Sequence, residues 1–121
     1  MRFNKVEDIK VWKMSIELVK EIYFLCRNNH NLSRDFSLKD QIQRASVSIP
    51  SNIAEGFERE SDKEFMRYLY IAKGSCAEVR TQLFIICEIG WISNDEYVLS
   101  NNKCLEISRM LMGLIKKIRL S

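Results

Sequence analysis

The chain has few residues that interrupt helices and few that bind metals. One proline and four glycines among 121 residues exclude collagen-like and Pro/Gly-rich disordered classes. Histidine occurs once, as His30, and the four cysteines form no Cys-x-x-Cys pair, so the usual spacing of a zinc site is missing. No apolar run approaches the roughly 18 residues that a membrane span needs. We therefore expect one globular, cytoplasmic domain with reduced thiols and no metal or other cofactor.

Neither sign of charge is in large excess, since 19 Lys and Arg against 16 Asp and Glu give a net charge of +3. This balance excludes a chain that is basic throughout but not one with a local basic patch. One such patch is predicted near the C-terminus, where Glu106 is the single acid. Its members are Lys103, Arg109, Lys116, Lys117 and Arg119. These bases could contact nucleic acid, or they could simply interact with the negative end of a helix dipole.

Four segments carry apolar residues at alternating spacings of three and four, and no segment alternates with period two. The spacing predicts helices over about 8–28, 37–56, 62–89 and 94–119. Ser61 to Glu64 and Ser93 to Glu96 read as capping boxes, and Ser37 with Asp40 resembles a third helix start. We therefore expect an all-α fold, an antiparallel up-down four-helix bundle that forms a single domain over residues 1–121.

The proline and the glycines inside the predicted helices each lead to a different structural prediction. Pro50 removes a backbone donor and crowds the carbonyl group of Ser46, so a kink is predicted in the second helix. Gly56 suits a helix end. Gly74 lies inside the third helix, where glycine costs about 1 kcal/mol relative to alanine, and predicts close packing of two helices.

The apolar surface is larger than one copy of the bundle covers. Residues 83–87 read LFIIC, and five consecutive apolar positions point in every direction around a helix. A second apolar row on the first helix adds to this excess. We expect a homo-oligomer, or else burial by the bundle's own helices and N-terminal arm. The expected interface residues are Val11, Leu18, Phe84, Ile85, Ile89 and Trp91.

Two rows of polar residues flank the apolar positions of the second and third helices. Gln41, Ser48, Asn52 and Glu55 lie on one helix and Ser75, Glu78 and Gln82 on the other. Buried polar groups need hydrogen-bond partners and can fix register, so we expect a network in which Arg44 joins Asn52 and Glu55, either within one subunit or between subunits. The alternative, catalysis by Glu55 or Glu78 as general acid or base, lacks a second titratable group at suitable spacing. No catalytic residue is therefore predicted.

The segment 41–56, QIQRASVSIPSNIAEG, resembles the signature of the 23S rRNA intervening-sequence protein family, also called the four-helix-bundle protein family. Agreement extends over roughly residues 8 to 92. The resemblance implies a small bacterial four-helix bundle that forms ring-like homopentamers, similar to the accessory variability determinant of diversity-generating retroelements, and no catalytic activity. The positions marked by the family pattern are Trp12, Gln41, Arg44, Pro50, Asn52, Glu55, Gly56, Gly74 and Glu78.

Two functions remain after these exclusions, and neither is enzymatic. The first is an accessory protein associated with RNA or DNA, for which a ring would multiply the C-terminal basic charge. The second is a scaffold whose ring binds a protein partner such as a polymerase through its excess apolar surface. Enzymatic activity is the weakest interpretation, because His30 lies in a polar loop without a nucleophile partner and the cysteines resemble small apolar core residues.

Overall fold

Helices make up almost all of the chain. The computed structural model describes residues 3–121. A short 3₁₀ turn, η1 (Val6–Asp8), leads into α1 (Lys10–Asn28), and a single turn, α2 (His30–Arg34), follows. Three long helices complete the chain, namely α3 (Phe36–Phe57), α4 (Asp62–Glu88) and α5 (Asn94–Leu120). The all-α helical fold predicted from the sequence is confirmed.

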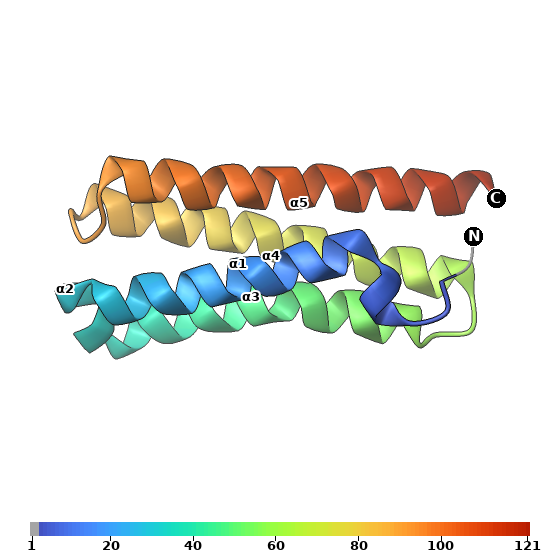
Figure 1. The fold of residues 1–121 in the computed structure, drawn as a ribbon, viewed down its shortest axis with the longest axis horizontal. Helices are drawn as coiled ribbons and strands as arrows, with labels where there is room; N and C mark the ends of the chain where they lie inside the picture. Colours follow the sequence, from blue (N-terminus) through green and yellow to red (C-terminus); the bar gives the residue numbers. More distant parts are fainter. Residues whose placement is uncertain (1–2) are drawn as a thin grey trace.

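The long helices lie side by side in a bundle (Figure 1). Successive helices run in opposite directions, and the described chain begins and ends at the same end of the bundle. Helix α3 packs against α1 and α4, and α5 packs against α4 and α1. The α1–α5 contact is the smallest of these four, so the bundle is most open along that face.

The segment between the first two long helices, predicted as a polar loop, forms a helical turn. Leu32 of α2 is fully buried, and it closes the end of the core. The cap of α3 also differs from expectation, because Asp35 accepts a hydrogen bond from the Leu38 backbone N–H at 2.8 Å. Ser37, predicted as the cap, lies inside the helix. An aspartate side chain two residues earlier thus fixes where α3 begins.

The starts of α4 and α5 agree more closely with the sequence. The Ser61 hydroxyl accepts from the Glu64 backbone N–H at 3.1 Å, and Ser93 and Glu96 form a reciprocal capping box. Gly90 adopts a φ of 83° after α4, a left-handed conformation that favours glycine. Helix α3 runs on through the buried Pro50, and the bend expected near Ser46 stays a prediction.

Apolar side chains from every helix of the bundle fill its centre. Val11 and Leu18 belong to this core, with exposed fractions of 3% and 0%. The expectation that they face another subunit is therefore wrong, because α3 and α5 flank α1 on two sides and cover its second apolar row. None of the helices in residues 3–121 has an apolar stretch long enough to cross a bilayer.

Candidate functional site

The polar rows of α3 and α4 meet, as the sequence predicts. The hydroxyl oxygens of Ser48 and Ser75 lie 2.8 Å apart. The Asn52 side-chain nitrogen donates to the Ser48 carbonyl oxygen at 2.8 Å and to the Ser48 hydroxyl at 2.9 Å. Ser75 is buried, whereas Ser48 and Asn52 are half-buried. The Ser48–Ser75 hydrogen bond joins α3 to α4 in one register, since a shift of either helix would break it.

The wider network expected around Asn52 is wrong within one chain. Arg44 Nε donates to the Asp40 carboxylate at 3.0 Å, and Glu55 accepts from Arg59 at 2.9 Å. Each cation thus pairs with an acid four residues earlier in the chain, a spacing that brings side chains together on or just past a helix. Glu55 and Glu78, the alternative acid or base, are both exposed.

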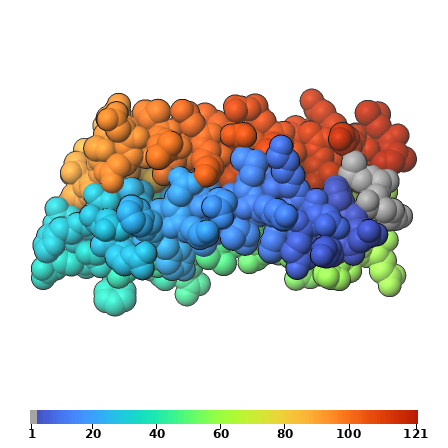
Figure 2. All heavy atoms as spheres, in the orientation of Figure 1, coloured from blue at the N-terminus to red at the C-terminus, as the bar shows by residue number. Residues whose placement is uncertain are grey.

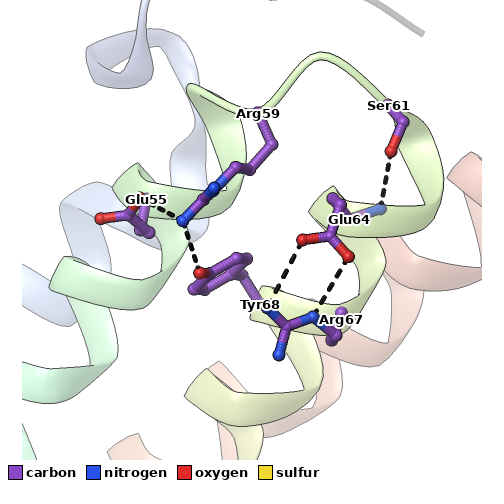
Figure 3. Close-up of polar contacts among 6 residues, drawn as sticks. All are labelled: Glu55, Arg59, Ser61, Glu64, Arg67 and Tyr68. Carbon is purple, nitrogen blue, oxygen red and sulfur yellow. Dashed lines mark hydrogen bonds and ion pairs between the residues drawn. The ribbon is translucent and has the colours of Figure 1, made fainter.

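Arg59, Arg67 and Tyr68 form a cluster where α3 passes into α4 (Figure 3). Arg59 donates to the Tyr68 hydroxyl at 2.7 Å. The guanidinium carbons of Arg59 and Arg67 lie 5.0 and 4.8 Å from the centre of the Tyr68 ring, within range of a cation–π interaction. The Arg67 guanidinium donates hydrogen bonds to the Glu64 carboxylate, and these bonds raise the pKa of Arg67. The cluster ties the end of α3 to α4. Because a carboxylate pairs with each arginine, the cluster offers little free positive charge.

The two marked glycines have opposite environments. A Cβ atom on the buried Gly56 would lie 2.7 Å from Tyr68 Cβ, so Gly56 allows the close approach of α3 to α4. A Cβ atom on Gly74 would meet nothing within 4 Å, and Gly74 is exposed. Helix α3 ends at Phe57, one residue after Gly56, so the predicted helix end is confirmed to within one residue, whereas the expectation of close packing at Gly74 is wrong within one chain.

The predicted basic residues fall into two groups. Lys103 binds the Glu21 carboxylate across the α1–α5 contact, so its charge is already neutralised. Arg109, Lys116, Lys117 and Arg119 are exposed. Arg119 donates to the hydroxyl of Tyr70 on α4 at 2.8 Å. The exposed bases thus lie on the C-terminal half of α5, without Lys103.

Tyr70 is a neighbour of these bases that the sequence analysis missed. Its side chain is 45% exposed. Residues 70 and 119 come together because α4 and α5 are antiparallel neighbours. No local pattern in the sequence encodes the register of that pair of helices, so only the three-dimensional arrangement reveals the contact.

Several apolar side chains on α4 and its C-terminal turn face solvent. Phe84, Ile85 and Ile89 are 53%, 41% and 47% exposed, and Ile71 is 40% exposed. The Phe84 ring makes an edge-to-face contact with Tyr97 of α5 at 6.1 Å between centroids, which puts it on the α5 side of α4. Trp91 is partly buried against the core. Exposed apolar surface therefore does lie on α4, whereas the predicted α1 residues Val11 and Leu18 are buried.

A mainly apolar groove follows the open contact between α1 and α5. Figure 2 looks onto this face. The groove has a volume of about 610 Å³, and Phe24 and Leu99 line it with exposed fractions of 61% and 67%. The carboxylates on its rim already have partners, as Glu17 pairs with Lys20 and Glu21 with Lys103. The groove thus presents an apolar strip whose polar rim includes these two ion pairs together with Arg27 and Glu96.

The buried thiols have the character of core residues. Burial raises the pKa of Cys26 to about 11 and those of Cys76 and Cys104 to about 12 from an ordinary value of 9.0. The nucleophilic thiolate form is therefore suppressed at neutral pH. Across residues 3–121, no three His, Cys, Asp or Glu side chains are grouped so that they could hold a metal ion.

Comparison with known proteins agrees with this helical arrangement. The structure of a protein of unknown function from the S23 ribosomal protein family of Bacteroides thetaiotaomicron is similar, with a TM-score of 0.82 and 29% identity over 88% of this chain and 98% of that one. No protein with a curated description matches the chain. The family model described as 23S rRNA-intervening sequence protein matches residues 7–113. The chain therefore belongs to the 23S rRNA-intervening sequence protein family.

Proposed function

We propose that this protein is a non-enzymatic accessory factor that associates with RNA or DNA as a homo-oligomer. The observation that carries the proposal is the group of exposed bases on the last turns of α5, with the half-exposed ring of Tyr70 beside Arg119. Bases that lack carboxylate partners remain free to neutralise phosphates, and the release of counterions then supplies most of the affinity.

Charge distribution separates this surface from four basic side chains whose charge is already neutralised. Arg44, Arg59 and Arg67 each pair with a carboxylate, and Lys103 pairs with Glu21. In the described part of the chain, no ion pair involves Arg109, Lys116 or Lys117. Interaction of these bases with the helix dipole is worth only about 0.3–1 kcal/mol each, and it leaves their charge available to a phosphate.

Assembly would multiply this charge, and the exposed face of α4 supports assembly. Ile71 and Ile85 are 14 residues apart, which is close to four helical turns, so they share one side of the helix. The exposed Gly74 lies between them, and it leaves space for the backbone of another helix. The ring-like homopentamer implied by the family resemblance would bury this face.

Fluorescence anisotropy with labelled single-stranded and duplex oligonucleotides over a series of salt concentrations tests the proposal. We expect micromolar binding at low salt with a steep negative slope of log affinity against log salt. The double variant Lys116→Gln, Lys117→Gln should reduce that slope by roughly 1.4, since each phosphate contact on a single strand contributes about 0.7. The matched control, Lys20→Gln with Arg34→Gln, removes the same charge elsewhere and should leave the slope unchanged. Absence of binding at low salt would overturn the proposal.

The groove between α1 and α5 favours a second candidate, a scaffold that binds a protein partner. Its apolar strip suits the apolar face of an amphipathic helix, and the exposed Phe24 and Leu99 would supply the contacts. The same anisotropy experiment separates the candidates. A scaffold without nucleic-acid affinity would bind no oligonucleotide at low salt, and Leu99→Ala would weaken its complex with the protein partner.

A further inference from the structure

A second groove lies on the opposite side of α5, between α5 and α4. It has a volume of about 290 Å³ and is lined by Ala77, Arg80, Thr81, Phe84, Tyr97 and Asn101. None of these residues carries a carboxylate, so the groove has positive charge without an acid in its lining. Arg80 Nε donates to the Asn101 side-chain oxygen at 3.2 Å. This neutral partner fixes the guanidinium in place and leaves its charge unpaired.

Two aromatic rings form one end of the groove. The planes of Phe84 and Tyr97 are 69° apart, an edge-to-face arrangement in which the two rings hold each other in place. Phe84 is 53% exposed, so part of its ring is open to solvent. The neighbouring side chains on α4, Ala77 and Thr81, are small and leave the groove open beside that ring. A planar group could therefore stack on Phe84 at little entropic cost.

The geometry points to this α4–α5 groove as a stacking site for an unpaired base of single-stranded nucleic acid, with the adjacent phosphate bound by Arg80. The inference rests on the proposed function, and it names the form of nucleic acid that the protein prefers. A base within a duplex is stacked on both sides and cannot reach Phe84, whereas an unpaired base can.

The groove also lines up with the basic end of α5. Tyr70, Ala77 and Phe84 recur every seven residues and share the α5 side of α4. Tyr70 and Phe84 are about 21 Å apart along the helix axis, which corresponds to roughly six nucleotides of a stacked strand at about 3.4 Å each. Arg119 contacts Tyr70 at the far end of this path. A strand laid along this path would meet an aromatic ring at each end, and the guanidinium groups of Arg80 and Arg119 would lie beside its phosphates.

Anisotropy with an unstructured 12-nucleotide RNA, a 12-base-pair RNA duplex and adenosine monophosphate as competitor tests the inference. We expect the wild-type protein to bind the single strand more tightly than the duplex. Phe84→Ala should weaken single-strand binding roughly tenfold or more and leave duplex binding unchanged. Phe84→Trp should preserve it, and Arg80→Gln should weaken it with a shallower salt slope. The control, Phe36→Ala, removes a more exposed aromatic side chain, 82% exposed at the start of α3, and should have no effect.

Ultraviolet crosslinking supplies a readout that a loss of folding cannot imitate. A 4-thiouridine oligonucleotide should crosslink to the tryptic peptide of residues 81–103, which carries both rings. Equal binding of single strand and duplex, with no effect of Phe84→Ala, would overturn the inference and leave the proposed function standing. Failure of wild-type protein to bind either oligonucleotide would overturn the proposed function as well. Displacement of the strand by micromolar mononucleotide would reassign the groove to free nucleotides and overturn the inference of a strand site.

Discussion

At the scale of single residues, glycines and cysteines illustrate how environment decides what a side chain contributes. Gly56 and Gly74 lie in long helices and look alike in sequence, as each follows isoleucine, alanine and one charged residue. The added Cβ atom would press on Tyr68 at Gly56 and would meet open space at Gly74. At Gly56 the close contact between α3 and α4 therefore offsets the cost of glycine in a helix. At Gly74 no contact within the chain offsets that cost.

This contrast predicts opposite effects of alanine at the two positions. Gly56→Ala should lower the free energy of unfolding by about 1–3 kcal/mol, because a Cβ-to-Cβ clash cannot be relieved by rotating a side chain. Gly74→Ala should raise it by up to about 1 kcal/mol in the unassembled chain, because alanine has the higher helix propensity. Urea titrations of both variants measure the difference. Equal stability of the two would contradict the assignment of Gly56 as the contact glycine.

The buried thiols predict a loss of stability in alkaline solution. The pKa values of Cys76 and Cys104 are raised to about 12 in the folded state from 9.0, so the unfolded chain releases these protons first. The folded state then binds more protons than the unfolded state above pH 9. The free energy of unfolding should fall between about pH 9 and 12 by up to about 1.4 kcal/mol per pH unit for each thiol. Urea denaturation as a function of pH measures it, and Cys104→Ala should flatten the curve over that range.

At the scale of helices, much of the fold follows from local signals, and the exceptions have physical reasons. Periodicity alone predicted the long helices, and Ser61 and Ser93 correctly marked two of their starts. The start of α3 was misjudged because Asp35, Ser37 and Asp40 are all suitable cap residues within one turn. The register between helices was not predictable, because it depends on long-range packing. For this reason the Ser48–Ser75 hydrogen bond was expected only in outline and the Arg119–Tyr70 contact was missed.

The position of the α3 cap makes a prediction at this scale. Asp35→Ala should lower the free energy of unfolding by about 1 kcal/mol, because the Leu38 N–H would lose the carboxylate that it donates to. Ser37→Ala should change stability by less than about 0.5 kcal/mol, since Ser37 is exposed inside the helix. Thermal unfolding followed by circular dichroism compares the two. A larger effect of Ser37→Ala than of Asp35→Ala would indicate that Ser37, and not Asp35, caps α3.

At the scale of the whole molecule, the distribution of side chains gives three faces of α4 and α5 different characters. The α3–α4 side carries the Ser48–Ser75 hydrogen bond, the outer side of α4 carries Ile71 and Ile85, and the α4–α5 side carries Arg80 and Phe84. The proposals use separate faces, so one assembled particle can bury the isoleucines and still present the α4–α5 groove. Substitutions on one face should therefore leave the function of another intact.

Assembly tests this separation directly. Ile85→Lys should convert the oligomer to monomers, because a buried lysine without a partner costs more than one subunit contact can offset. The side chain is already 41% exposed in the single chain, so the helical circular dichroism spectrum should be unchanged. Leu99→Lys adds the same charge to a more exposed position on the α1–α5 face and should leave the mass of the particle intact. Light scattering on a sizing column measures both. If wild-type protein elutes as a monomer at micromolar concentration, the outer side of α4 is not a subunit contact, and the pooled charge proposed for the ring is lost with it.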